Sequence, residues 1–216
     1  MMRLTKTLIA ATALTILPLS LAFAQTSSDG SIVLNGQVDL KESSSNVNTT
    51  ITNVAGNTTG TSASVGNNLE VVTMNNANVS NNQYVGNVSI SADQNATVKN
   101  TGGTVTLESQ AICNAADVST DPHTTSVSSQ QECQATDPSA LLNASVTNAG
   151  NDVSLSSQAV GNSFSEDTNA AYMPTQTTQI NNSNVASTVN STVKNASGNV
   201  TVNSAAIGNN AQIVQY

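Results

Sequence analysis

Residues 193–209 read Val193-Lys-Asn195-Ala-Ser-Gly198-Asn-Val-Thr-Val202-Asn-Ser-Ala-Ala-Ile207-Gly-Asn209, and three earlier stretches of the chain repeat this pattern. In each copy two asparagines stand 14 residues apart, and the copies follow one another at intervals of 47, 48 and 47 residues. The four asparagine pairs are Asn53/Asn67, Asn100/Asn114, Asn148/Asn162 and Asn195/Asn209. A period this regular predicts stacked supersecondary units rather than one irregular globule.

The repeat unit itself alternates between apolar and polar residues. In the last copy one face carries Val200, Val202, Ser204 and Ala206, and such alternation with β-branched residues is typical of a half-buried strand. Gly-Asn pairs separate the runs and indicate turns, because both residues tolerate positive φ. Each unit therefore reads as a short strand, a tight turn, a longer strand and a further turn at the second Gly-Asn pair.

The rest of each period is more variable, but residues 83–92 partly echo the same pattern. This echo predicts two coils of about 24 residues in each period, and about seven short coils in total. The predicted fold class is all-β, a repetitive β-solenoid over residues 45–216 with a period of about 47 and no helix. Its handedness stays open, as either hand fits the pattern.

Stacked coils place like residues above like, so the repeated asparagines are expected to form hydrogen-bonded ladders along the stack. The first predicted ladder consists of Asn53, Asn100, Asn148 and Asn195. The second consists of Asn67, Asn114, Asn162 and Asn209. Asn-x-Ser/Thr triplets such as Asn48-Thr-Thr50 and Asn143-Ala-Ser145 also occur, but a chain with 30 Asn produces such glycosylation motifs by composition alone.

Residues 1–24 have the features of a signal peptide. Arg3 and Lys6 precede an apolar run over residues 8–21, and Ala22-Phe23-Ala24 has the form of a cleavage site,. The run is too short for a good membrane span. The mature chain is therefore expected to begin near Gln25, followed by a flexible leader over residues 25–44.

Charge and composition narrow the function classes. The mature chain has three Lys, no Arg and 13 acidic residues, so its net charge is 3 − 13 = −10. Nucleic-acid and anionic-lipid binding need basic patches, which this balance does not supply. With no Trp and 2% aromatic residues, the core must consist of Val, Ile and Ala with hydrogen-bonded Asn, Ser and Thr rows. Such a composition also fits a disordered chain, but the regular repeat favours order.

Cys113 and Cys133 are the two cysteines. An exported chain meets an oxidising compartment, so we predict that they form a disulfide closing a long insertion between repeat elements. Their spacing is unlike Cys-x-x-Cys, and two thiols with the distant His123 are too few ligands for a metal site.

No catalytic, cofactor-binding or metal-binding constellation is predicted. His123 stands alone, and Glu166-Asp167 reads as an adjacent pair of solvated acids in a loop,. Calcium-binding repeats and phosphate-binding glycine loops are absent from the sequence,. A carbohydrate-binding or carbohydrate-processing β-helix remains the alternative. It needs an acidic or aromatic groove on one face, and convergence of Asp93, Asp117, Glu166 and Asp167 would favour it.

Short motifs carry a family resemblance. Three motifs resemble the repeats of curlin-type surface amyloid subunits: Gln83-Tyr-Val-Gly86-Asn87, Gln110-Ala-Ile-Cys113-Asn114 and Gln158-Ala-Val-Gly161-Asn162. Residues 157–164 and 205–209 are more similar to the holdfast anchor proteins of stalked bacteria. That resemblance implies an exported protein that attaches adhesive polysaccharide to the cell envelope. Curlin repeats are about half as long, and their Gly and Asn are not adjacent as they are here.

These observations together favour a non-enzymatic structural protein of the cell surface or outer membrane, or one that is released from the cell. It is expected to anchor adhesive polysaccharide or to form curlin-like fibres in adhesion and biofilm. The expected partners are a second copy of the chain, an envelope anchor protein or an extracellular polysaccharide, with no nucleic acid and no cofactor. A disordered matrix component is a third hypothesis.

Overall fold

A computed structural model describes residues 25–27, 30–73, 77–120, 126–169 and 173–216. The described chain is all-β and forms three sheets that run the length of a solenoid. Sheet A contains β1 (Gln25–Ser27), β2 (Gly30–Asp39), β5 (Ala77–Val85), β8 (Ser126–Cys133) and β11 (Thr175–Asn181). Sheet B contains β3 (Ser43–Val54), β6 (Ile90–Thr101), β9 (Ser139–Ala149) and β12 (Ala186–Ala196). Sheet C contains β4 (Thr58–Thr73), β7 (Val105–Thr120), β10 (Val153–Thr168) and β13 (Val200–Gln215).

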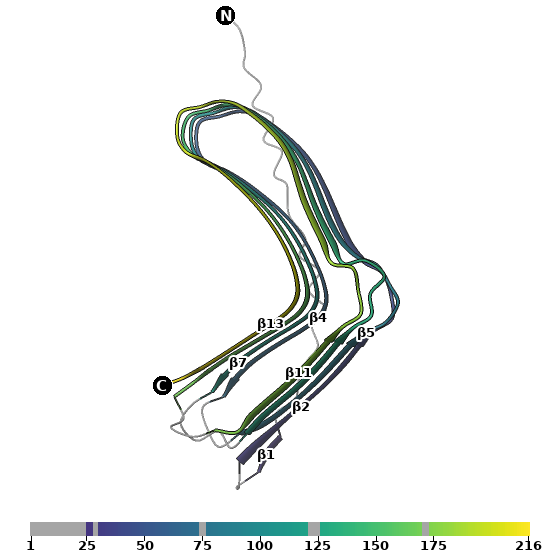
Figure 1. Cartoon of the computed structure of the whole chain (residues 1–216). Helices are drawn as coiled ribbons and strands as arrows, with labels where there is room; N and C mark the ends of the chain where they lie inside the picture. Colours follow the sequence, from purple (N-terminus) through teal and green to yellow (C-terminus); the bar gives the residue numbers. More distant parts are fainter. Residues whose placement is uncertain (1–24, 28–29, 74–76, 121–125, 170–172) are drawn as a thin grey trace, which may run out of the picture.

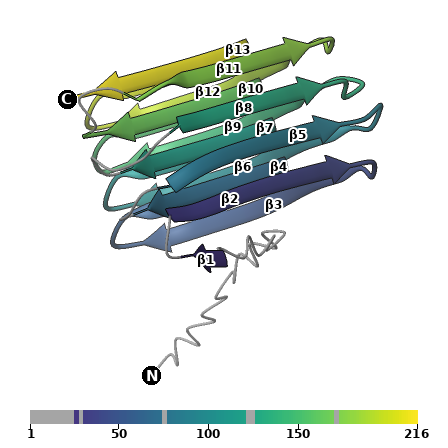
Figure 2. The ribbon, with the colours of Figure 1, turned by 90° about the horizontal axis from the view of Figure 1, so that it is seen from below.

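Each coil contributes one strand to each sheet, and the coils stack in parallel register (Figure 2). Val105 of β7, for example, pairs with Thr58 of the coil below and Val153 of the coil above. The short β1 is the exception, since it pairs antiparallel with the start of β2. The predicted all-β solenoid is confirmed.

Viewed along the stack, the coil is a flattened two-layer ribbon rather than a round tube (Figure 1). The 16-residue strands of sheet C form one layer, and sheets A and B follow one another in the opposite layer. Buried inward side chains alternate with outward ones along most of β7 and β9 in the middle coils, with one interruption in each strand. Small and β-branched residues fill most of the space between the two layers, together with several leucines and the fully buried Phe164.

The number of coils predicted from the sequence is wrong. One 47-residue period makes one coil of three strands, so there are four coils in the described chain rather than about seven. The second Gly-Asn pair does not end a strand as expected. Val65 pairs with Ile112 and Asn67 pairs with Asn114, so Gly66 lies opposite Cys113 inside the continuous strand β4. A Cβ at Gly66 would lie 2.7 Å from the carbonyl oxygen of Cys113, which explains the glycine.

The first Gly-Asn region, by contrast, is a true turn at the end where sheets B and C meet. One asparagine in each coil has a positive φ, between 55° and 59°: Asn53, Asn100, Asn148 and Asn195. Asn is one of the few residues that enter this left-handed region at low cost, so the repeated Asn defines the turn in every coil.

The solenoid also begins earlier than the sequence indicated. Residues 30–39, placed in a flexible leader over residues 25–44, form β2 and pair with β5. Asn35 and Gln37 point inward here while Ile32 and Leu34 are exposed. Val33 is buried on the inward face as well, so apolar residues lie on both faces of the strand and alternation did not reveal it. The predicted signal peptide, residues 1–24, lies outside the described residues.

Candidate binding surfaces

The first asparagine row forms a ladder along the turn between sheets B and C. Asn100, Asn148 and Asn195 each donate from Nδ2 to Oδ1 of the asparagine one coil earlier, at 2.9, 2.8 and 2.9 Å. The ladder is exposed. A shallow groove of about 480 Å³ runs beside it, lined by these asparagines together with Gly102 and Gly150.

The second asparagine row lies inside the solenoid and connects its two layers. Asn67, Asn114 and Asn162 donate to Oδ1 of the next asparagine at 2.9, 2.8 and 2.8 Å. The same Nδ2 atoms also donate to backbone carbonyls of sheet A, those of Tyr84, Glu132 and Ile180. Each interior amide thus uses both N–H groups, as a buried polar group must.

A glutamine ladder that the sequence analysis missed complements this row from the opposite layer. Gln83, Gln131 and Gln179 each donate from Nε2 to Oε1 of the preceding glutamine, at 2.9, 2.8 and 2.8 Å. They also donate to sheet C carbonyls, those of Ala115, Ser163 and Asn210. The spacing of Gln37, Gln83, Gln131 and Gln179, at 46, 48 and 48 residues, could have revealed the ladder.

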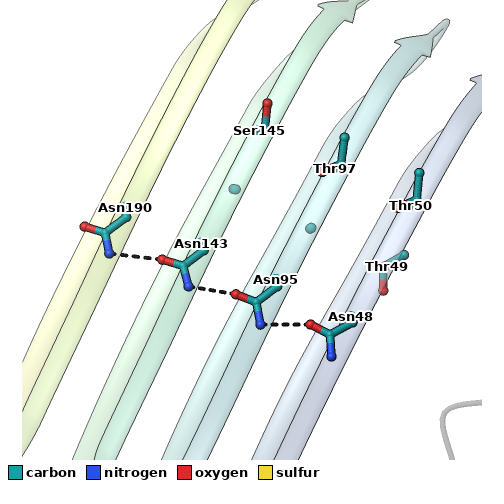
Figure 3. Close-up of a pocket in the computed structure, with 10 residues that line it drawn as sticks. Asn48, Thr49, Thr50, Asn95, Thr97, Asn143, Ser145 and Asn190 are labelled. Carbon is teal, nitrogen blue, oxygen red and sulfur yellow. Dashed lines mark hydrogen bonds between the residues drawn. The ribbon is translucent and has the colours of Figure 1, made fainter.

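A fourth row lies on the outer face of sheet B (Figure 3). Asn95, Asn143 and Asn190 donate to the preceding asparagine at 2.9, 2.7 and 3.0 Å, beginning with Asn95 to Asn48. These residues begin the Asn-x-Ser/Thr triplets that the sequence analysis attributed to composition. Their intervals of 47, 48 and 47 match the repeat, and this was the overlooked signal. They line a second groove of about 480 Å³.

The disulfide between Cys113 and Cys133 is confirmed, with 6.0 Å between the Cα atoms. It does not close an insertion. Cys113 lies in β7 of the second coil and Cys133 ends β8 of the third, and both are fully buried. The bond therefore joins two layers and two successive coils. In the coils on either side, glycine takes the place of Cys113, as Gly66 and Gly161 show.

The acidic residues do not gather in one groove. Glu166 and Asp167 lie in strand β10 rather than in a loop, and Glu166 points inward with no exposed surface. Asp93 lies on sheet B, and Asp117 lies on the outer side of sheet C. Among the described residues no group of three or more His, Cys, Asp or Glu could hold a metal ion. His123 lies outside the described residues.

Burial gives Glu166 distinctive electrostatics. Desolvation raises the pKa of its carboxyl above the ordinary value, while the hydrogen bond from Thr175 Oγ1 to Oε1, at 2.8 Å, acts in the opposite direction. Oε2 is buried and has no partner. Apolar residues hold the equivalent positions of the other coils, namely Val71, Val118 and Ile213.

Glu166→Val should therefore stabilise the protein at neutral pH, by roughly 1–2 kcal/mol in the free energy of unfolding. A raised folded-state pKa means that the folded chain holds the proton more tightly than the unfolded chain does. The stability contributed by Glu166 is then complete below the unfolded pKa, near 4.3, and is lost as pH rises through the folded pKa.

Urea unfolding of Glu166→Val and wild type from pH 4 to pH 8 measures this difference directly. The gain should be smallest at the acidic end and grow with pH, while the other carboxyl groups contribute equally to both proteins. An advantage of the variant that is the same at every pH would contradict a titrating Glu166.

These features define the class of protein: a repeat β-solenoid whose successive coils are joined by polar ladders inside and outside. A family model described as holdfast attachment protein D matches residues 22–215, and the chain belongs to that family. No curated protein matches the chain. No solved structure matches it either. In the described part of the chain, none of the secondary structure is a helix long and apolar enough to cross a membrane.

Proposed function

We propose that this chain is a non-enzymatic structural protein of the cell surface that anchors adhesive polysaccharide to the envelope. Family membership over nearly the whole chain is the observation that carries the proposal. The architecture supports it, because four ladders of four amides and a buried disulfide make a stiff rod suited to bearing load. The alternative of carbohydrate processing finds no support in the described acids, which lie on different faces.

The last coil supports a docking role for one end of the rod. Val200 and Val202 of β13 occupy the positions of the buried Val153 and Leu155, yet they are 49% and 47% exposed. Among the described residues, no strand pairs with the outer edge of β13. Uncovered edges of this kind template the pairing of another strand. An envelope protein or a second copy of the chain would cover it.

Deleting the gene in the producing bacterium tests the anchoring role. Cells without the protein should make adhesive but release it into the medium, and the full-length chain should restore attachment. Surface labelling of intact cells locates the protein at the same time. Deletion cells that keep their adhesive firmly attached would refute the proposal.

Electron microscopy with far-UV circular dichroism separates the two forms of the structural role. Filaments with a β spectrum after days of incubation would support curlin-like fibres, consistent with the open last coil. Discrete short rods with a β spectrum would support a monomeric anchor. Val202→Asp should prevent any filament by placing a charge at the uncovered coil, whereas a variant on the outer face, Thr201→Asp, should not.

A further inference from the structure

The most distinctive surface of the molecule is the groove on the outer face of sheet B, along Asn48, Asn95, Asn143 and Asn190 (Figure 3). We propose that this groove binds a neutral, linear polysaccharide that lies along the solenoid axis, across the four coils. The proposal rests on the anchoring function above and names the surface that would perform it.

Unused hydrogen-bonding capacity is the first argument. Each ladder bond uses one N–H of an amide that has two, and one of the lone pairs on Oδ1. The second N–H groups of Asn95 and Asn143 have no partner among the described residues. The same holds for the hydroxyls of Thr97 and Ser145, in the row beside the amides. These are the donors and acceptors that sugar hydroxyl or N-acetyl groups require.

Preorganisation is the second argument. The ladder fixes every amide in the same orientation, so little side-chain entropy remains to be lost on binding. The interior ladders already connect the coils, and the outer amides face solvent instead. The groove volume, about 480 Å³, falls in the usual range for ligand sites.

The repeat of the site selects the kind of ligand. Neighbouring parallel strands are about 4.8 Å apart, which is comparable to the advance of an extended glycan chain per sugar. One coil therefore meets about one sugar, and weak contacts along four coils add up. None of the residues that line the groove is ionisable. This neutrality favours an uncharged chain, whereas the net charge of −10 would repel an acidic one.

The test compares the exported, processed wild-type chain with Asn95→Ala/Asn143→Ala. Binding is measured by retention on chitin, on cellulose and on polysaccharide extracted from the producing cells, with polygalacturonate as the acidic comparator. Gln110→Ala/Gln158→Ala is the matched control, because it removes two amides and one ladder bond of 3.0 Å from the outer face of sheet C. The Asn95/Asn143 variant loses three ladder bonds of the outer face, so thermal melting is measured for all three proteins to show that each is folded at the assay temperature.

Wild type and control should be retained on at least one neutral polymer, and the Asn95/Asn143 variant should bind roughly tenfold or more weakly. Equal retention of variant and control would overturn the proposal, as would wild type that binds no neutral polymer. Self-association through this face would appear as a change in oligomeric state of the Asn95/Asn143 variant without any loss of glycan, and would also overturn it.

Attachment assays on cells distinguish the groove proposal from the anchoring function. If the deletion strain releases its adhesive but the Asn95/Asn143 variant restores full attachment, the groove proposal fails and the anchoring function stands. If the deletion strain keeps its adhesive, the anchoring function fails, and glycan retention by the purified chain then judges the groove alone.

Discussion

Gln131→Ala should lower the free energy of unfolding by about 3–5 kcal/mol. Gln131 is fully buried and donates to Gln83 Oε1 and to the carbonyl of Ser163, at 2.8 and 2.9 Å. Its own Oε1 accepts from Gln179 Nε2 at 2.8 Å. The substitution removes one hydrogen bond each from Gln83 Oε1, the Ser163 carbonyl and Gln179 Nε2. It also opens a cavity, and each effect is costly where water cannot enter.

Urea unfolding followed by far-UV circular dichroism measures the loss. Gln110→Ala is the matched control, since it removes the same side chain and one ladder bond from the outer face of sheet C. Water can replace that bond, so the control should lose no more than about 1 kcal/mol. Equal losses in the two variants would mean that the interior ladder has no special role in holding the layers together.

Removing the disulfide, with Cys113→Ser/Cys133→Ser, should cost about 3 kcal/mol for a crosslink that closes a loop of this length. The two cysteines are separated by 20 residues. The solenoid should remain, while the end of β7 and the whole of β8, within residues 114–132, should lose protection from amide exchange and from protease. Unchanged protection there would contradict the prediction.

The neighbouring coil offers a design that separates the crosslink from its packing. In the first two coils the equivalent residues are Gly66 and Val85, and a Cβ at Gly66 would lie 3.0 Å from Val85 Cγ2. Cys113→Gly/Cys133→Val copies that apolar contact. It should be more stable than the double serine variant, and its stability should not respond to reductant. If the two variants are equally stable, the crosslink alone accounts for the loss.

Much of this architecture could be predicted from the sequence because the repeat is local. The spacing of Asn53, Asn100 and Asn148 and the alternation around Val105 set the strands, the turn and the repeat length without reference to distant residues. The disulfide could be predicted because the chain has two cysteines and is expected to enter an oxidising compartment. The missed row of Asn48 and its equivalents shows the limit of arguments from composition. The row follows the repeat period, but its Asn-x-Ser/Thr triplets were attributed to the high Asn, Ser and Thr content.

The sequence by itself determined that the chain is an all-β repeat with stacked asparagines, because alternation and period are properties of neighbouring residues. Only the tertiary structure decided that one period closes one coil, and that Asn67 and Gln83 lie in opposite layers, each bonded to the backbone of the other layer. It also decided that Glu166 faces inward while Asp167 faces out. These features depend on how a bent strand folds back over two others, and that closure is set by contacts between residues far apart in the chain.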